Sequence, residues 1–220
     1  MIVFVRRALP RFYPILDADL LLRAGLSIEG FARELREAGI RFLQYRDKEA
    51  SDEVVLERAA LLRRIFPASD SCLILNDRAG LVLSAAYDGI HVGQEDLSPA
   101  QVRAMLGVDV LIGVSTHGDR QFMSAGEGPA DYVAIGPVFA TTSKQNPDPV
   151  VGVEGVRAAR AISSKPMVAI GGINRSNCAA VVEAGADSVA VISDLVPREG
   201  SSTGKIIEEF FLLLGDHVAP

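Results

Sequence analysis

The chain has 220 residues, which suits one large domain or at most two small ones. Hydrophobic residues make up 49% of the sequence and charged residues 23%, so the composition excludes the disordered and fibrous classes and can fill a core. The formal net charge is -6, without any block of Lys and Arg, which argues against nucleic acid or an anionic membrane as a partner but leaves room for a local cationic pocket.

Cysteine usage and the N-terminal segment indicate a cytoplasmic protein. Cys72 and Cys178 lie far apart, in no C-x-x-C or metal-binding spacing, which predicts two buried reduced thiols. The segment MIVFVRRALP places its apolar run before the arginines, the reverse of a secretory signal, and no later run approaches the ~20 apolar residues that span a bilayer. We treat residues 1–11 as an N-terminal extension of the domain.

Apolar runs of strand length recur along the chain, at 12–16, 41–45, 72–76, 88–92, 110–114, 131–135, 166–170 and 187–191. Segments of helical period lie between them. In two of these segments the apolar residues at helical spacing are Phe31, Ala32, Leu35 and Ala38, and then Val55, Ala59, Leu62 and Phe66. Gly39, Gly128 and Gly185 each stand shortly before a strand, where a glycine can take the left-handed conformation that ends a helix.

The alternation of strands and helices predicts a single (β/α)8 TIM barrel over residues 1–220. Eight units without a linker or a change of composition favour a closed barrel, with the helical segment 203–214 closing it. The alternative is an open doubly wound sheet in which one of the runs is not a strand. In a barrel, the active site is expected at the carboxyl ends of the strands.

Polar residues interrupt the second apolar run at its carboxyl end, in the sequence FLQYRDKEAS at 42–51. Such residues are costly to bury without partners. Side chains two apart on a strand share a face, so we expect Gln44, Arg46 and, if the extended geometry continues, Lys48 to point toward the barrel mouth. Two cations would then meet at the end of this strand.

Two carboxylates follow the third and fourth strands. Asp77 comes directly after Asn76 at the end of CLILN, and Asp96 lies in HVGQED. Consecutive strands of a barrel are neighbours, so the two carboxylates can face each other and hold Mg²⁺, which takes its remaining ligands from phosphates and water. The alternative is that both residues are local caps, in a turn where Ser98 begins a helix at Pro99.

The loop after the sixth strand, GPVFATTSKQNPDP, is long and rich in hydroxyl groups. Its residues Thr141, Thr142, Ser143 and Lys144 offer donors suited to phosphate oxygens. Loops of this length in compact domains are usually functional or disordered. We expect an ordered lid, and a solvated surface loop is the alternative.

Glycines and a serine follow the seventh and eighth strands, in AIGGIN and AVISD. Gly171, Gly172, Ile192 and Ser193 can aim backbone N–H groups at an anion, and barrels often build a phosphate site from these two loops and the helix that follows. Ser115, after the fifth strand, is either an N-cap or a ligand hydroxyl. The residues therefore describe one site for a metal-bound polyphosphate and a second site for a monophosphate.

The motifs QYRDK, LNDR, HVGQED, GVSTH, GPVFATTSK, AIGGI and AVIS occur in this order between about Phe12 and Leu195, and together they resemble the thiamine phosphate synthase family. The resemblance implies a transferase of thiamine biosynthesis (EC 2.5.1.3). Such enzymes join 4-amino-2-methyl-5-(diphosphooxymethyl)pyrimidine to a thiazole phosphate, giving thiamine phosphate and diphosphate. Two positions depart from the family pattern: PILDAD at 14–19, where a threonine-aspartate pair is usual, and Ser143, where a second threonine is common.

The resemblance also implies a role for each matching residue. The pyrimidine diphosphate would meet Gln44, Tyr45, Arg46, Asp47, Lys48, Asn76, Ser115 and Lys144. The thiazole phosphate would meet Thr141, Thr142, Ser143, Gly172, Ile192 and Ser193. Asp77 and Asp96 would hold Mg²⁺. The residues expected in the catalytic step are Arg46, Lys48, Ser115 and Lys144.

The implied chemistry is a dissociative one, in which diphosphate leaves a pyrimidine cation that the thiazole nitrogen then captures. Cations at the mouth would stabilise the leaving charge. No protein nucleophile is needed, which agrees with the absence of a Ser/His/Asp arrangement in the sequence.

Three other functions compete with this interpretation. A related thiazole tautomerase would carry its catalytic histidine near His117, but this chain retains Lys48, Asp77 and Asp96, which a tautomerase could lose. A Schiff-base aldolase needs a lysine inside the barrel, whereas Lys165 precedes the seventh strand. A non-catalytic regulator should have lost part of the charged set, and none is missing. The sequence leaves open whether the chain forms a homo-oligomer.

Overall fold

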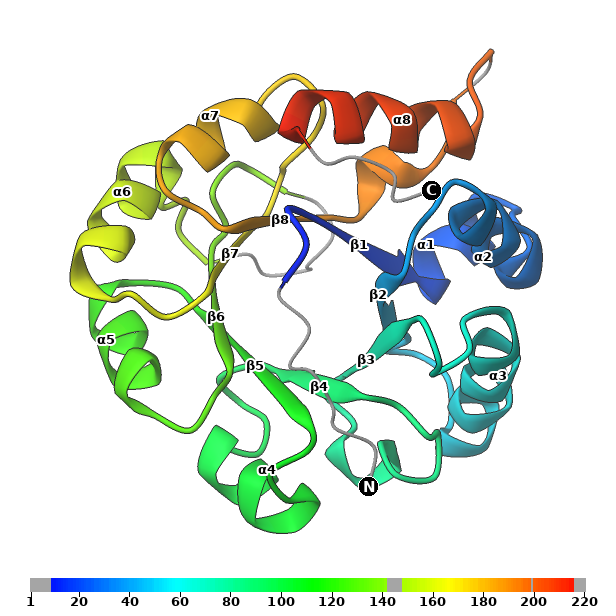
Figure 1. The fold of residues 1–220 in the computed structure, drawn as a ribbon, viewed down its shortest axis with the longest axis horizontal. Coiled ribbons are helices and arrows are strands. Elements are labelled where there is room, and N and C mark those ends of the chain that lie inside the picture. Colours follow the sequence, from blue (N-terminus) through cyan, green and yellow to red (C-terminus); the bar gives the residue numbers. More distant parts are fainter. Residues whose placement is uncertain (1–8, 142–147, 199, 216–220) are drawn as a thin grey trace.

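The computed structural model describes residues 9–141, 148–198 and 200–215, and these form a closed barrel of eight parallel strands in sequence order (Figure 1). The expected TIM barrel is confirmed, and the open-sheet alternative is wrong. The strands are β1 (Phe12–Asp17), β2 (Phe42–Arg46), β3 (Cys72–Asn76), β4 (Gly89–Val92), β5 (Leu111–Thr116), β6 (Tyr132–Ile135), β7 (Met167–Ile170) and β8 (Ser188–Val191).

Helices surround the barrel as an outer ring (Figure 1). The α-helices are α1 (Ala18–Arg23), α2 (Ile28–Glu37), α3 (Asp52–Ile65), α4 (Pro99–Leu106), α5 (Asp119–Glu127), α6 (Gly152–Ile162), α7 (Cys178–Glu183) and α8 (Thr203–Leu214). Two short 3₁₀ helices, η1 (Ala79–Leu81) and η2 (Ser193–Leu195), follow β3 and β8. The apolar positions expected in α2 and α3 are buried against the strands, except that Ala38 is partly exposed.

The strands separate two layers of core, because successive side chains point to opposite sides of a strand. In β1, Tyr13 and Ile15 fill the barrel interior, while Phe12 and Leu16 pack outward against the helices. The last helix, α8, closes this outer layer: the ring of Phe210 stacks on Phe12 at a centroid distance of 4.6 Å. Both cysteines are buried free thiols, as expected.

The glycines at the helix ends behave in two ways. Gly39 and Gly185 have φ angles of 94° and 107°, so they take the expected left-handed conformation. Gly128 has a φ of -79° and an extended backbone, so the expectation for it is wrong. The reason is the next residue, Pro129, whose ring drives the preceding residue into the extended region.

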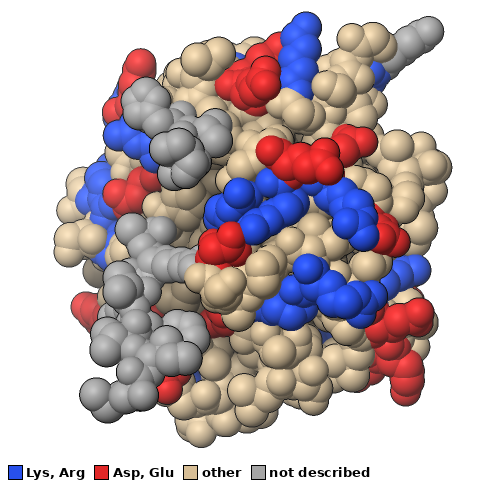
Figure 2. Space-filling view, turned by 45° about the vertical axis from the view of Figure 1, so that its right-hand side comes forward, with Lys and Arg blue, Asp and Glu red and all other residues tan. Residues whose placement is uncertain are grey.

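The described surface gives two further observations about partners. The face that the 45° turn of Figure 2 brings forward carries Lys and Arg side chains interleaved with Asp and Glu. A surface on which charges of both signs alternate does not create a strong field of one sign. Among the described residues, no helix combines the length and the apolarity that a membrane crossing requires.

Candidate active site

A chain of polar side chains crosses the interior of the barrel. Gln44 donates through Nε2 to the Tyr13 hydroxyl (2.8 Å), which lies 2.9 Å from the Tyr132 hydroxyl. The Tyr132 hydroxyl contacts His91 Nδ1 (3.1 Å), and His91 Nε2 contacts Ser115 Oγ (2.8 Å). Hydrogen bonds thus link two predicted pyrimidine-binding residues, Gln44 and Ser115, through three residues that sequence reasoning did not single out.

Burial controls the ionisation of this network. Burial lowers the pKa of His91 to about 4, so the imidazole is neutral at pH 7 and can donate one hydrogen bond while accepting another. Burial likewise raises the pKa of the Tyr13 and Tyr132 hydroxyls above their usual value. The network is therefore a set of neutral donors and acceptors. The alternation of side chains along a strand could have predicted this network, since it places His91 and Tyr132 at inward positions of β4 and β6.

Arg46 lies at the carboxyl end of β2, paired in register with Asp17 of β1. Its guanidinium forms an ion pair with the Asp17 carboxylate, which is almost completely buried. The other Asp17 oxygen accepts a hydrogen bond from the backbone N–H of Leu20 (2.8 Å) and caps α1. The PILDAD segment thus supplies, in Asp17, the acid that holds Arg46.

Lys48, Asp77 and Asp96 form a second charged group, beside the ends of β3 and β4. The Lys48 ammonium forms an ion pair with Asp77, and Asp77 adopts a left-handed backbone (φ 61°) that aspartate tolerates. Partial burial raises the pKa of Asp96, and the adjacent Asp77 carboxylate raises it further. Asp96 also accepts a hydrogen bond from the Gly93 N–H (2.7 Å). The two neighbouring carboxylates are ligands of the kind that a hard cation prefers.

The expectation of a turn before α4 is confirmed alongside this group. Ser98 is the N-cap of α4 and forms a capping box with Gln101, and the helix begins at Pro99. Capping of the helix therefore falls to Ser98, which leaves the Asp96 carboxylate facing Asp77. Asn76 lies next to this pair, in register with His91 and partly buried.

Tyr45 and Asp47 lie on the other side of β2. Tyr45 is fully buried between the strands and the helices, and its hydroxyl donates to Asp47 Oδ2 (2.7 Å). Asp47 also accepts hydrogen bonds from Arg58 (2.7 Å) and from the Ala50 N–H (3.2 Å). The structure therefore does not bring these two predicted contacts to the mouth, because side chains alternate along a strand and five consecutive residues cannot share one face.

Arg78, in the LNDR motif, braces the loop that carries Lys48. Its guanidinium donates to the Ala50 carbonyl (2.6 Å) and to the Asp47 carbonyl (3.3 Å), and it forms an ion pair with Asp52 at the start of α3. Sequence reasoning assigned no role to this residue. Its contacts indicate that it fixes the loop between β2 and α3.

The loops after β6 and β7 approach each other closely. The Val138 N–H donates to the Ile170 carbonyl and the Phe139 N–H to the Gly171 carbonyl, each at 2.9 Å. A Cβ on Gly172 would stand 2.5 Å from the Ala140 carbonyl oxygen, which leaves no room for a side chain. The φ of 65° also favours glycine at this position. Thr141 follows this contact and is partly buried. The predicted lid residues Thr142, Ser143 and Lys144 lie outside the described residues.

A cavity of about 470 Å³ opens between the loops after β7 and β8. Its lining includes Gly172 and Ser193, two of the predicted phosphate contacts. Among the described residues, the backbone N–H groups of both have no hydrogen-bond acceptor. Ile192 lies just before them and packs on the barrel interior. The expected α-helix does not follow directly: the loop 171–177 precedes α7, and η2 follows β8.

The residues of the competing functions are held by structural contacts. Lys165 donates through Nζ to the carbonyls of Gly128 (2.7 Å) and Ala130 (2.8 Å), at the amino end of the barrel and far from the mouth. His117 Nδ1 lies 2.7 Å from the Gly136 carbonyl, and its Nε2 lies 3.4 Å from Asp148. Both ring nitrogens of His117 thus face partners.

The closed barrel, with its ionisable side chains and glycine loops gathered at the carboxyl ends of the strands, defines a TIM-barrel enzyme. Residues 12–195 match the family described as thiamine monophosphate synthase. Thiamine-phosphate synthase of Koribacter versatilis is 49% identical over 88% of this chain and 93% of its own. That of Chloroflexus aurantiacus is 40% identical over 86% of each. The solved structure of thiamine phosphate pyrophosphorylase from Pyrococcus furiosus has a TM-score of 0.82 and 29% identity, covering 94% of this chain and 96% of that one.

The chain therefore belongs to the thiamine monophosphate synthase family. It is an enzyme of the transferase class that functions in thiamine biosynthesis.

Proposed function

We propose that the enzyme couples 4-amino-2-methyl-5-(diphosphooxymethyl)pyrimidine with a thiazole phosphate to give thiamine phosphate and diphosphate. The observation that carries the proposal is the presence of two different anion-binding regions at one mouth. Arg46 and Lys48 supply cations on the β2–β4 side, while the amides of Gly172 and Ser193, which have no acceptor within the described ranges, line a cavity on the β7–β8 side. A reaction that joins a diphosphate ester to a monophosphate needs both regions.

The bond changes balance without a protein nucleophile. The C–O bond between the pyrimidine methylene and diphosphate breaks, and diphosphate leaves with the electron pair. The thiazole nitrogen donates its lone pair to the resulting pyrimidine cation and forms the C–N bond. Stabilising the leaving charge is then the main electrostatic task, assigned to Arg46, Lys48 and, from the lid, Lys144. Holding the two substrates in contact is the other task.

The buried network would place the pyrimidine. Gln44 and Ser115 end the hydrogen-bond chain, so their free donor and acceptor positions are fixed relative to each other. The neutral His91 holds the Ser115 hydroxyl without adding a positive charge that would repel the pyrimidine cation. A rigid polar frame of this kind gains affinity by pre-organisation.

The carboxylates at the mouth fit Mg²⁺. Partial burial and the adjacent Asp77 carboxylate raise the pKa of Asp96, and a divalent cation held by the two carboxylates would offset that effect. These two residues would hold the ion, and when bound it supplies positive charge to the diphosphate oxygens. Lys48 already pairs with Asp77 and would share the same diphosphate.

A direct assay tests the proposal. The purified enzyme is incubated with both substrates and Mg²⁺, and thiamine phosphate and diphosphate are quantified, with each substrate omitted in turn. We expect the two products in equal amounts and only when both substrates are present. Diphosphate release that does not require the thiazole phosphate, or no thiamine phosphate at all, would contradict the proposal.

A further inference from the structure

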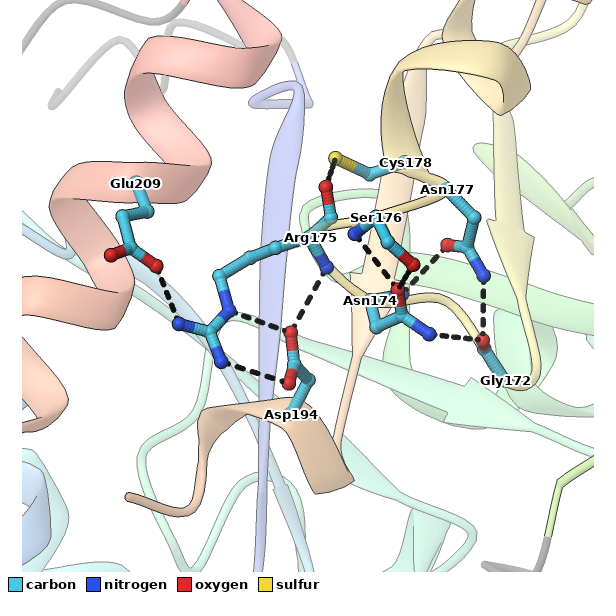
Figure 3. Close-up of polar contacts among 8 residues, drawn as sticks. All are labelled: Gly172, Asn174, Arg175, Ser176, Asn177, Cys178, Asp194 and Glu209. Atoms are coloured by element: carbon cyan, nitrogen blue, oxygen red, sulfur yellow. Dashed lines mark hydrogen bonds and ion pairs between the residues drawn. The ribbon is translucent and has the colours of Figure 1, made fainter. Parts of the chain in front are cut away.

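Arg175 joins three segments of the chain that are distant in sequence (Figure 3). It lies in the loop after β7, and both its Nε and its backbone N–H donate to Asp194 Oδ2, at 2.9 and 3.0 Å. Its Nη2 donates to Asp194 Oδ1 (3.2 Å), and its Nη1 donates to Glu209. Asp194 belongs to η2 after β8, and Glu209 belongs to α8.

The same loop is braced from within, next to the predicted phosphate contacts. The Gly172 carbonyl accepts hydrogen bonds from Asn177 Nδ2 (3.1 Å) and Asn174 Nδ2 (3.4 Å). The Asn174 N–H in turn donates to Asn177 Oδ1 (2.8 Å). Arg175 lies within this braced segment, and Asp194 stands immediately after Ser193. The ion pair between Arg175 and Asp194 therefore connects the loop of Gly172 to the segment of Ser193.

We propose that Arg175 is a positioning residue, which, held by Asp194 and Glu209, fixes the two loops that receive the phosphate end of the thiazole substrate. This inference rests on the proposed function. It gives α8 a part in substrate binding beyond closing the barrel, because Glu209 anchors the guanidinium from that helix.

The charge balance argues against direct phosphate binding by Arg175. Every guanidinium nitrogen faces a carboxylate, and two carboxylates surround one cation. Hydrogen bonds to Asp194 and Glu209 raise the pKa of Arg175 above its usual value. A phosphate would have to displace an acid that is part of the same chain. Arg198, which is exposed, lines the same cavity and is a better placed direct contact.

The test measures both substrates in wild type, Arg175→Ala, Arg175→Lys and Glu209→Gln. We expect Arg175→Ala to raise the KM for the thiazole phosphate about tenfold, equivalent to about 1.4 kcal/mol. The KM for the pyrimidine diphosphate and kcat at saturation should stay near the wild-type values. Arg175→Lys should recover part of the loss, because lysine keeps the charge but not the fork of donors. Glu209→Gln should also raise the KM for the thiazole phosphate, but by less than Arg175→Ala does.

Two controls separate positioning from general stability. Arg160→Ala removes the ion pair with Asp187 (2.8 Å) at the opposite end of β7 and β8, and should leave both KM values unchanged. Calorimetry should show that Arg175→Ala weakens the thiazole phosphate but not the unphosphorylated thiazole alcohol, since the two loops receive the phosphate. If Arg175→Ala does not fold, the KM and calorimetric measurements on Glu209→Gln test the positioning role instead.

The outcomes distinguish this inference from the proposed function. An unchanged KM for the thiazole phosphate in Arg175→Ala, or an equal loss for both substrates, would overturn the positioning role while turnover still supports the function. If the wild type makes no thiamine phosphate, the calorimetric comparison alone tests the positioning role. Weaker binding of the thiazole phosphate, but not of the thiazole alcohol, by Arg175→Ala supports the role. Equal affinity of wild type and Arg175→Ala for the thiazole phosphate refutes it.

Discussion

The two sides of the barrel mouth use different parts of the chain to attract anions. On the β2–β4 side, Arg46 and Lys48 provide full charges, and each already pairs with an acid of the same protein. On the β7–β8 side, backbone N–H groups of Gly172 and Ser193 provide partial charges that lack an acceptor in the described structure. The first side must exchange partners when a substrate binds, whereas the second is ready to receive one.

This difference matches the proposed chemistry of the two substrates. The diphosphate gains negative charge as it leaves, so contacts that strengthen with developing charge act on the transition state. The monophosphate of the thiazole does not change, so its contacts hold the substrate in place. We therefore expect changes on the β2–β4 side to lower kcat and changes on the β7–β8 side to raise one KM.

The largest effect is expected at the carboxylate pair. Asp77→Ala or Asp96→Ala should lower Mg²⁺-dependent turnover by about a hundred- to a thousandfold or more, a loss at least as large as that of one transition-state contact. Melting temperature should change little, because these residues lie at the mouth and not in the core. Asp70→Ala, which removes an exposed acid that pairs with Arg36, is the matched control and should retain activity. Normal turnover in either active-site variant would show that the pair does not hold the metal.

The next largest effect concerns the two cations. Losing a charge-assisted hydrogen bond costs about 1.5–3 kcal/mol, so Arg46→Ala or Lys48→Ala should each lose about ten- to a hundredfold in kcat/KM. Arg46→Lys should recover part of this loss. If Arg46 only pairs with Asp17 for stability, Arg46→Ala would melt lower and still turn over at the wild-type rate.

A smaller effect is expected on the opposite side, from Gly172→Ala. The added Cβ would collide with the backbone of Phe139 and Ala140 and would also strain a φ of 65°. We expect a roughly tenfold rise in the KM for the thiazole phosphate, comparable to losing one neutral or weakly charged contact. Gly25→Ala is the control, since Gly25 has a similar φ of 70° and nothing within 4 Å of its Cβ position. Equal effects of the two variants would show that backbone strain alone is responsible.

The smallest effect on turnover should come from the buried network. Tyr132→Phe removes the hydroxyl between Tyr13 and His91 and leaves buried partners unsatisfied, at a cost of about 1–3 kcal/mol in unfolding free energy. Activity should fall only about twofold to fivefold, as Gln44 and Ser115 lose their fixed frame. Tyr87→Phe is the matched control: the buried Tyr87 hydroxyl has no partner among the described residues, so its removal should not destabilise the protein. Denaturant unfolding of both variants measures the difference.

The sequence predicted the elements of this fold closely, because the barrel strands are buried on both sides and appear as short apolar runs. The predicted 203–214 helix coincides with α8, and Ser98 caps α4 as expected. The left-handed conformation predicted for Gly128 was wrong, because Pro129 restricts the preceding backbone to the extended region. Local sequence patterns therefore predicted the conformation correctly in α8 and at Ser98, and failed at Gly128, where the next residue restricts the backbone.

The site was harder to predict, since pairing depends on distant residues. The strand-end pattern predicted Gln44, Arg46 and Asp77, and the resemblance added Tyr45 and Asp47. The alternation of side chains along β2 turns the side chains of these two residues away from the barrel interior. Arg46 pairs with Asp17, which lies on another strand, and Asp194 pairs with Arg175, which lies in another loop. The residues next to Arg46 or Asp194 in the sequence do not indicate these pairings.

The central claim is that one mouth holds two separate anion sites, and a crossed kinetic comparison tests it most directly. We measure kcat and the KM for each substrate in wild type, Lys48→Ala and Gly172→Ala. We predict that Lys48→Ala lowers kcat and leaves the KM for the thiazole phosphate unchanged, while Gly172→Ala raises the KM for the thiazole phosphate and leaves kcat and the KM for the pyrimidine diphosphate near the wild-type values. If Lys48→Ala raises the KM for the thiazole phosphate, or if Gly172→Ala lowers kcat or raises the KM for the pyrimidine diphosphate as much, the two sides of the mouth do not form separate sites.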